Sequence, residues 1–408
     1  MITRNVWLRC VKYVKRKEIV LIIGARQVGK TTLLKQIKKK LDAEHQIVNF
    51  FSLEDPTLLN LLNQKPENIF SYISKTKKKQ YLLIDEIQYL EKASGFLKYI
   101  YDIYGEKIKL IVTGSSAFYV DKSFNDSLAG RKRIIELFPF SFSEFIKAKE
   151  ATNSSPLSEK IISETWCKTG RKRNLLVPEK EKLWNYLEEY LLYGGYPSVI
   201  LEPDTKEKCI ILKDLYVSFL KKDILEAGVS DTHKFYQLVR ILSEGAGSLF
   251  NASEIGNTIG LSPDTVREYL HILRKSYIFS LVVPYFSNLR KELTKMPKAY
   301  LLDGGFRNAV LNTFENPQER LDKGAFLENQ VLIALHTYGF EKINFWRTQD
   351  KNEVDFVIDG NHALEVKWQK AAYNPKKYEK FTGSYPHIPL TPVFFRDDTN
   401  IDLLDIMH

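Results

Sequence analysis

Apolar residues recur along the first third of the chain in short runs that alternate with helical patterns. The stretches between the runs carry apolar residues at the three- and four-residue spacing of one helix face. Strands that alternate with helices predict an α/β fold with an open parallel sheet, whose ligand site lies at the carboxyl edge of the strands. The strand-like runs are residues 19–23, 47–52, 81–85, 109–113 and 133–138.

The pattern changes twice beyond these strands. Residues 151–175 are polar and rich in Ser, Thr and Lys, which predicts a linker or an insertion. Residues 179–245 return to helical periodicity, with one interruption at residues 194–197, Gly-Gly-Tyr-Pro. We expect this interruption to be an interhelical corner whose glycines allow close packing.

Residues 235–303 have the pattern of a winged helix. Ser253 and Ser262 are placed to cap two helices, and strands near 278–284 and 299–302 would form the wing. The outer face of the second helix mixes both signs of charge, so DNA docking and a structural or protein-contact role both stay open. That face carries Asp264, Thr265, Arg267, Glu268 and His271.

The last hundred residues contain a predicted hairpin between strands at 353–358 and 363–367. If its turn centres on Gly360, then Asp355 lies opposite Glu365, and Lys367 shares their face. Facing carboxylates repel unless a cation lies between them, and Mg²⁺ suits two carboxylates and a phosphate. Lys367 could then orient or deprotonate water, or stabilise developing charge. A register shifted by one residue would remove this arrangement.

Composition fits a globular protein, since 44% of the 408 residues are apolar and 12% are aromatic. Such a length predicts two to four domains. No apolar run approaches the about 18 residues of a membrane span, and the start lacks a signal-peptide layout. The three cysteines lie far apart, without metal-ligand spacing. We therefore expect a cytoplasmic protein with reduced thiols and no membrane partner.

The formal net charge of +10 favours contact with polyanions. Basic clusters occur at residues 38–40, 77–79, 131–133 and 171–173. Such runs are also common on solvated faces, so charge alone leaves contact with DNA open.

The residues that follow the first strand carry the most specific chemistry. They read GARQVGKT, which fits G-x-x-x-x-G-K-[ST] between a buried strand and a helix. Backbone N–H groups would face a phosphate, Lys30 would reach the β- and γ-phosphates, and Thr31 would ligate Mg²⁺. We therefore predict that ATP binds here. The predicted contacts are Gly24, Ala25, Arg26, Gln27, Val28, Gly29, Lys30, Thr31 and Thr32.

The strand at 81–85 supplies the second half of the predicted nucleotide site. Asp85 would hold Mg²⁺ through water, and Glu86 would act as the general base. An acidic pair can also simply cap the next helix. At the end of the strand at 109–113, Ser115 or Ser116 could sense the γ-phosphate, although a turn with an N-cap is an equal alternative.

The spacing Asp355, Glu365, Lys367 on a hairpin resembles the core of PD-(D/E)xK nucleases. Glu328, on the helix that precedes the hairpin, matches an acidic position that some members use. The resemblance implies Asp355, Glu365 and Glu328 as Mg²⁺ ligands, with Lys367 as a catalytic residue. An ordinary exposed hairpin is the alternative, and the fold also serves other uses.

The landmarks together resemble prokaryotic AAA+ ATPases that carry a C-terminal domain related to PD-(D/E)xK nucleases. This resemblance implies an ATPase core, a winged helix and a nuclease-like terminal domain. Arg131 matches an arginine that this family places before a Pro-Phe-Ser segment, and it could act as a finger within the chain or from a neighbour. A surface basic cluster is the alternative. The landmarks are residues 24–33, 83–88, 113–116, 129–131, 137–145, 194–197, 353–356 and 365–367.

These observations predict four parts in order along the chain. We expect an AAA+ P-loop ATPase domain at 1–150, a linker and helical lid region at 151–234, a winged helix at 235–303 and an α/β nuclease-like domain at 304–408. The expected activity is ATP hydrolysis with Mg²⁺, coupled to DNA binding or processing. The alternative is a nucleotide-dependent signalling or scaffold switch whose terminal domain binds a partner and cuts nothing. A homo-oligomer is compatible with either reading.

Overall fold

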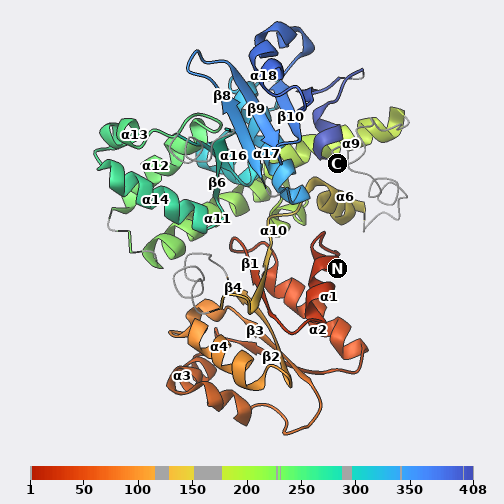
Figure 1. The fold of residues 1–408 in the computed structure, drawn as a ribbon, viewed down its shortest axis with the longest axis vertical. Helices are drawn as coiled ribbons and strands as arrows, with labels where there is room; N and C mark the ends of the chain where they lie inside the picture. The colour runs from red at the N-terminus through yellow and green to blue at the C-terminus, as the bar shows by residue number, and fades with distance from the viewer. Residues whose placement is uncertain are drawn as a thin grey trace. The chain divides into compact units, whose positions relative to one another are not determined.

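The computed structural model divides the chain into two compact units (Figure 1). The N-terminal unit consists mainly of Thr3–Phe138, and the C-terminal unit of Pro139–Arg274 with Ile278–His408. The predicted linker at 151–175 lies outside the described residues. The structure describes residues 2–114, 128–150, 177–226, 228–229, 231–286, 296–340, 342–397 and 399–407.

The N-terminal unit is built on a five-stranded sheet in the order β2-β3-β4-β1-β5. Every neighbouring pair is parallel, which confirms the predicted parallel sheet. Strands β1, β3 and β4 are buried along their whole length, as expected for parallel strands with helices on both faces. The strands are β1 (Ile19–Ile23), β2 (Ile47–Ser52), β3 (Gln80–Asp85), β4 (Ile108–Gly114) and β5 (Lys132–Glu136).

Helices connect these strands, and α2 and α4 pack against β4. Each buries a stripe of apolar side chains, such as Leu33, Leu34 and Ile37 of α2. The helical segments are α1 (Trp7–Val14), α2 (Lys30–Ala43), α3 (Pro56–Gln64), η1 (Pro66–Ser71), η2 (Ile87–Tyr89) and α4 (Ala93–Tyr104).

A six-stranded mixed sheet lies in the C-terminal unit, in the order β11-β10-β9-β8-β6-β7. The β6–β7 hairpin supplies the two strands expected for the wing, and β6 also pairs in parallel with β8. Residues predicted to belong to two domains, 235–303 and 304–408, therefore share one sheet. The strands are β6 (Phe279–Pro284), β7 (Lys298–Leu301), β8 (Ile343–Arg347), β9 (Glu353–Ile358), β10 (His362–Lys367) and β11 (Leu390–Phe394).

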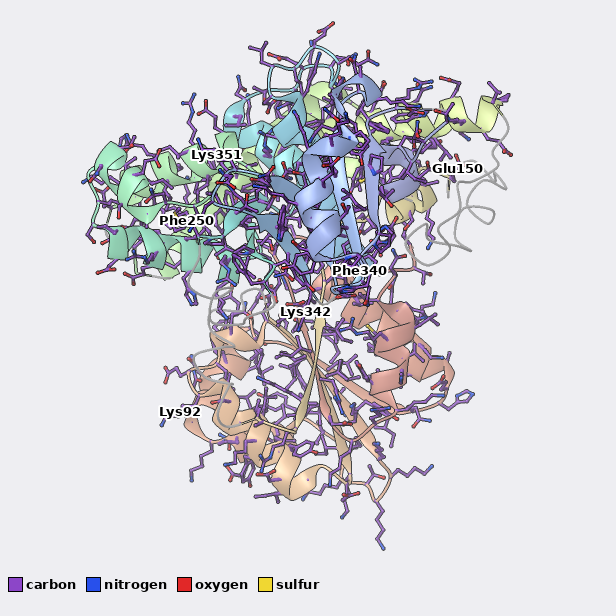
Figure 2. All side chains as sticks on the ribbon, turned by 45° about the horizontal axis from the view of Figure 1, so that its top comes forward. Lys92, Glu150, Phe250, Phe340, Lys342 and Lys351 are labelled. Atoms are coloured by element: carbon purple, nitrogen blue, oxygen red, sulfur yellow. The ribbon has the colours of Figure 1, made fainter. Side chains whose placement is uncertain are left out.

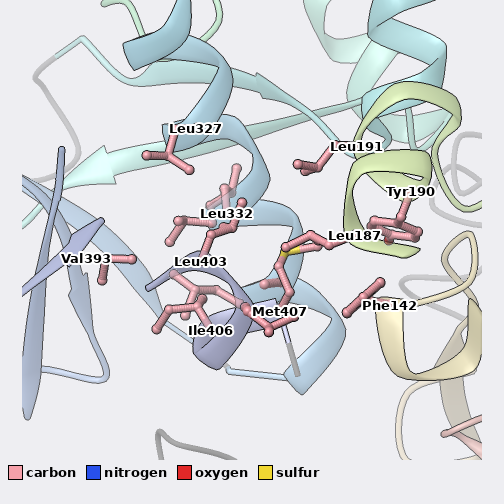
Figure 3. Packing of buried hydrophobic residues seen from close by; sticks show 14 of the residues in the cluster. Phe142, Leu187, Tyr190, Leu191, Leu327, Leu332, Val393, Leu403, Ile406 and Met407 are labelled. Carbon is pink, nitrogen blue, oxygen red and sulfur yellow. The ribbon is translucent and has the colours of Figure 1, made fainter. Parts of the chain in front are cut away.

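In the sequence, the helices of the C-terminal unit come before β6 and after β7. Buried side chains from several of these helices form one apolar core. Leu187 of α9, Leu332 of α17 and Met407 of α19 converge in that core (Figure 3). The helices before β6 are α6 (Phe142–Glu150), α9 (Val177–Tyr193), α10 (Pro197–Ile200), α11 (Thr205–Glu226), α12 (Thr232–Glu244), α13 (Ala252–Ile259) and α14 (Pro263–Lys275). Those after β7 are α16 (Gly304–Leu311), α17 (Lys323–Tyr338), η3 (Lys370–Ala372), η4 (Pro375–Tyr378), α18 (Glu379–Ser384) and α19 (Leu403–Met407).

The glycine corner between α9 and α10 packs as closely as predicted. The Phe140 amide donates to the Gly195 carbonyl oxygen at 2.7 Å, and a Cβ on Gly195 would lie only 2.2 Å from the Phe140 oxygen. Gly194 has φ of +72°. The Asp303 carboxylate accepts a hydrogen bond from the Gly195 amide at 2.7 Å, which ties the corner to the start of α16.

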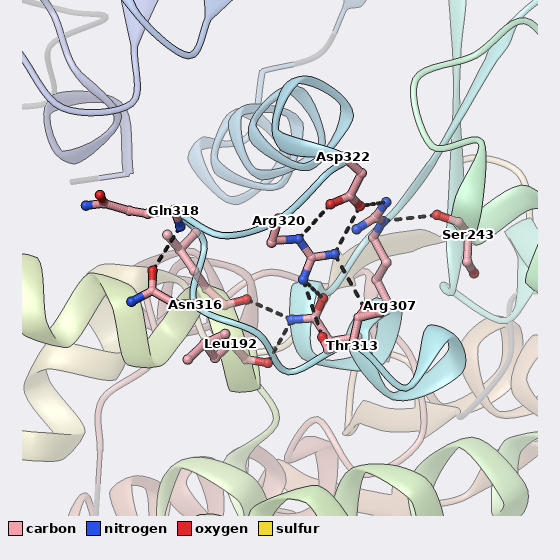
Figure 4. A network of polar contacts seen from close by, with 10 residues as sticks. Leu192, Ser243, Arg307, Thr313, Asn316, Gln318, Arg320 and Asp322 are labelled. Carbon is pink, nitrogen blue, oxygen red and sulfur yellow. Dashed lines mark hydrogen bonds and ion pairs between the residues drawn. The ribbon is translucent and has the colours of Figure 1, made fainter.

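A second polar network joins α12, α16 and the segment before α17 (Figure 4). Asp322 accepts hydrogen bonds from Arg307 at 2.7 Å and from Arg320 at 2.8 Å. Arg307, which is fully buried, also donates to the Ser243 carbonyl oxygen at 3.0 Å. Burial would raise the pKa of Asp322, but the hydrogen bonds and charges of the two arginines outweigh burial and lower it to about 2.

None of the helices in the described residues combines the length and the apolar character that crossing a membrane would need.

Candidate nucleotide site and C-terminal carboxylate cluster

The phosphate loop leaves the carboxyl end of β1 between two glycines that the backbone requires. A Cβ on Gly24 would lie 2.0 Å from the Leu137 carbonyl oxygen, so a side chain has no room there. Gly29 has φ of +96° and precedes α2 without a side-chain cap. The first amides of α2 therefore lack a capping side chain, which is the arrangement that binds phosphate at a helix N-terminus.

Lys30 opens α2 and lies almost fully buried over the loop. Its ammonium group donates hydrogen bonds to the carbonyl oxygens of Gly24, at 3.1 Å, and of Ala25, at 2.8 Å. These contacts hold a positive charge inside the loop, where phosphate oxygens could replace the carbonyl partners. Of the other predicted contacts, Val28 is buried and Arg26 is half-buried, whereas Gln27 and Thr32 are exposed.

Thr31 and Asp85 come together across the sheet. The Thr31 hydroxyl donates to Asp85 Oδ2 at 2.7 Å. Strand β4 lies between β1 and β3, and Thr113 near its end donates to Asp85 Oδ1. Thr113 was not predicted as a site residue. Its hydroxyl near the end of a central strand could have indicated that it lies at the site. Ser115 and Ser116, predicted to act at this place, lie outside the described residues.

Glu86 follows β3 in the left-handed backbone region, with φ of +57°. Its amide donates to the Thr113 hydroxyl at 3.0 Å, and its carboxylate accepts a hydrogen bond from Gln88. A non-glycine residue in this region is uncommon and is found at functional sites. Asp85, Glu86 and Thr113 therefore form one hydrogen-bonded group beside the phosphate loop.

Arg131 does not lie near the phosphate loop within the chain. Its carbonyl oxygen accepts a hydrogen bond from the Ile19 amide, so it marks the amino end of β1, whereas the loop follows the carboxyl end. The guanidinium pairs with Asp102 of α4 at 2.7 Å. A five-residue strand separates the two ends by roughly 16 Å. A finger from within this chain is therefore not formed, and a finger from a neighbouring chain stays a prediction.

Arg4 braces the nucleotide loop and was not predicted. It is buried, and it donates to the Val28 carbonyl oxygen at 2.8 Å and to the Phe138 carbonyl oxygen at 2.7 Å. These two bonds tie the loop to the chain beyond β5. No pattern in the sequence marks a single arginine so far upstream.

The residues at the loop fit a magnesium ion that binds together with a nucleotide. Such an ion needs only one or two protein oxygens, because phosphates and water complete its shell. The adjacent hydroxyl of Thr31 and carboxylate of Asp85 supply them.

The C-terminal hairpin has the predicted register. His362 pairs with Ile358 and Leu364 with Phe356, so the turn centres on Gly360 and Asp355 comes opposite Glu365. Both carboxylates are buried. Asp355 Oδ2 accepts a hydrogen bond from the Val366 amide at 2.8 Å. Glu365 Oε1 accepts hydrogen bonds from Lys367 and from Tyr378, whose hydroxyl lies at 2.8 Å.

Glu328 of α17 is held by two residues of β7 that the sequence analysis did not select. Lys298, whose side chain is 2% exposed, lies 2.8 Å from Glu328 and 2.5 Å from Glu353. The Tyr300 hydroxyl also donates to Glu328. Lys298 and Tyr300 occupy alternate positions of β7, as a shared strand face requires, but that face could not be identified without the tertiary partners.

Burial dominates the electrostatics of this carboxylate cluster, which comprises Glu328, Glu353, Asp355 and Glu365. Burial alone would lower the pKa of Lys298, but the charges of Glu328, Asp355 and Glu353 outweigh it and raise that pKa. Burial and the neighbouring Asp355 raise the pKa of Glu365. Lys298 and Lys367 thus bring two positive charges to these four carboxylates.

The cluster fits a metal ion poorly in this arrangement. Across the described part of the chain, no three His, Cys, Asp or Glu side chains gather in a way that could hold one. Lys298 and Tyr300 donate hydrogen bonds to Glu328. Lys367 and Tyr378 donate hydrogen bonds to one oxygen of Glu365. Glu365 Oε2 is buried without a hydrogen-bond partner, and it is a single oxygen. The predicted magnesium site of Glu328, Asp355 and Glu365 is not assembled.

Comparison with protein families supports the assignment of the N-terminal unit. Residues 16–146 match a family described as an AAA domain. Residues 185–316 and 323–402 match two further families described as domains of unknown function. The AAA match and the loop geometry together indicate an ATPase-type function for the N-terminal unit.

Relatives match along most of the chain. An uncharacterized protein of Haemophilus influenzae is 27% identical over 100% of this chain and 97% of its own length. An uncharacterized protein of Methanocaldococcus jannaschii is 27% identical over 85% of this chain and 73% of its own length.

Two solved structures illustrate a partial likeness. The Thermotoga maritima RuvB Holliday junction branch migration motor has a TM-score of 0.35 and 16% identity, and the match covers 72% of this chain and 95% of that one. AMPPCP-bound DnaA from Aquifex aeolicus has a TM-score of 0.34 and 19% identity, with 66% and 85% covered. Scores this low do not establish a shared function.

Proposed function

We propose that this protein hydrolyses ATP with Mg²⁺ at the carboxyl edge of the N-terminal sheet. The observation that carries the proposal is the hydrogen-bonded group of Thr31, Asp85, Thr113 and Glu86 beside the phosphate loop. Loop amides and Lys30 would bind the phosphates, and Glu86 would accept the proton of the attacking water. Thr31 and Asp85 would hold the magnesium ion, which neutralises charge on the phosphates when bound.

Replacement of the proposed base tests this assignment. We expect Glu86→Gln to bind ATP normally and to lower turnover at least about a hundredfold, because the amide cannot accept the proton. Phosphate release and ATP affinity should be measured in parallel. Glu91→Gln, an exposed change shortly beyond Glu86, is the matched control and should keep full turnover. Equal turnover in both variants would rule out Glu86 as the base.

We further propose that ATP turnover is coupled to nucleic-acid binding by the C-terminal unit. The formal charge of +10 supports an anionic partner. The order α12, α13, α14, β6, β7 supports the predicted winged helix, a module common in nucleic-acid binding. Binding without cleavage is the form that we favour, because Lys298 already pairs with Glu328 and Lys367 with Glu365.

Cleavage by Asp355, Glu365 and Lys367 is the second candidate, and the hairpin register favours it. The discriminating experiment incubates single- and double-stranded DNA with Mg²⁺ or Mn²⁺, with the wild-type protein and with Asp355→Ala. We expect no nicking above background with either protein. Products that form with the wild type and disappear with Asp355→Ala would establish the nuclease instead.

A further inference from the structure

Two adjoining cavities lie in the C-terminal unit, apart from every residue that the proposed ATP chemistry uses. One has a volume of about 440 Å³ and lies against α13 and α14. The other has a volume of about 530 Å³ and lies against β8. Met296 lines both, so they meet at that residue.

The first cavity has a basic wall. Arg267, His271 and Arg274 line it from α14, at positions i, i+4 and i+7, which share one helix face. Among the lining residues that the structure describes, none is a carboxylate. Arg267 pairs at 2.6 Å with Asp264 of the same helix, but both side chains are largely exposed, and such pairs contribute little.

Arg274 is the basic group best suited to an anionic ligand. No carboxylate within the described ranges pairs with it, and burial lowers the pKa of its guanidinium. The Arg274 side chain is exposed, so its guanidinium is open to a phosphate, which it can bind through two N–H groups. Buried Leu270 and Phe250 also line the cavity and add apolar surface to it; Phe250 is labelled in Figure 2.

Aromatic side chains form one wall of the second cavity. Phe286, Phe345, Trp346 and Tyr385 all line it. Neighbouring rings hold two of these rings in place, since Phe381 lies 5.3 Å from the Trp346 ring and 5.4 Å from the Tyr385 ring. Phe345 and Trp346 are almost fully buried, so Phe286 and Tyr385, which are half-buried, are the part of this aromatic wall that could stack on planar bases. Such stacking has no strong sequence preference.

We propose that the two cavities together bind single-stranded nucleic acid, with phosphates against Arg267 and Arg274 and bases against the aromatic wall. A single strand alternates anionic phosphates with accessible base faces, which matches a basic cavity and a second, partly aromatic cavity that share Met296. A duplex keeps its bases stacked, and the exposed carboxylates of Asp264 and Glu268 on α14 oppose its approach. This inference rests on the nucleic-acid part of the proposed function and specifies its ligand.

Fluorescence anisotropy with a labelled oligothymidylate of about twelve nucleotides tests the proposal on the full chain without ATP. We expect Arg274→Gln to weaken binding about tenfold and to reduce the salt slope by about one. Arg240→Gln, an exposed arginine of α12 outside both cavities, is its control.

Phe286→Leu should weaken binding about five- to tenfold, against Phe314→Leu as control. A duplex of equal length should bind more weakly, and Phe286→Leu should not change its affinity. Polyglutamate should not displace the oligonucleotide.

Three results would overturn the inference. Variants that bind like their controls would place the strand elsewhere while leaving nucleic-acid binding intact. Displacement of the oligonucleotide by polyglutamate at equal charge would assign the cavities to an acidic peptide. No binding by the wild-type protein would remove the nucleic-acid part of the proposed function as well, whereas ATP turnover, measured separately, would be unaffected.

Discussion

Individual polar groups outside the recognisable motifs fix the geometry of both sites. Thr113 bridges Asp85 and Glu86 at the nucleotide site, and Arg4 ties the loop to the chain beyond β5. In the carboxylate cluster, Lys298 contacts both Glu328 and Glu353. Each of these residues acts through partners distant in the sequence, so only the fold reveals its role.

The ionisation of a single residue, Asp322, is expected to make the free energy of unfolding depend on pH. The pKa of Asp322 falls from an ordinary 3.8 in the unfolded chain to about 2 in the folded protein. Its ionised form therefore contributes fully to the free energy of unfolding above the unfolded pKa, and this contribution is lost as pH falls toward the folded pKa. We expect the stability difference between wild type and Asp322→Asn to shrink by at most about 2 kcal/mol between pH 5 and pH 2.

Urea unfolding at several pH values, followed by fluorescence, measures this difference. Asp264→Asn, which changes an exposed carboxylate, is the control and should show no such trend. If the free energy difference between wild type and Asp322→Asn is the same at pH 5 and pH 2, Asp322 is not held ionised by its two arginines.

At the scale of elements, local pattern predicted most strands and helices, and tertiary contacts decided the rest. The strands expected at 278–284 and 299–302 are β6 and β7, and the hairpin register around Gly360 is as predicted. The cap of α13 was predicted wrongly, because Asn251 rather than Ser253 accepts the first helical amides. Both residues are good caps, so sequence alone could not choose between them.

The glycine corner gives a prediction for an element junction. Gly195→Ala would bring a methyl group to 2.2 Å from the Phe140 carbonyl oxygen, so the corner must open. We expect a loss of about 2–4 kcal/mol in the free energy of unfolding. Gly95→Ala in α4, with nothing within 4 Å, should be neutral or stabilising. Equal stability of the two variants would show that the corner is not tightly packed.

For the whole molecule, a local motif is easier to predict from sequence than a contact between distant segments. The phosphate loop is a local motif, so its position and role could be predicted from eight consecutive residues. The pairing of β6 with β8 joins Val283 to Asn344, and no local signal marks a contact so distant in sequence. Strands from the two predicted ranges, 235–303 and 304–408, therefore lie in one sheet.

The most direct test of the central claim is ATP binding in the presence of Mg²⁺, measured by calorimetry on the full chain. We predict one ATP per chain for the wild type and for Lys39→Ala, an exposed change on α2, and a loss of affinity of at least about a hundredfold for Lys30→Ala. If Lys30→Ala binds ATP as the wild type does, nucleotide does not occupy this loop and the account is contradicted.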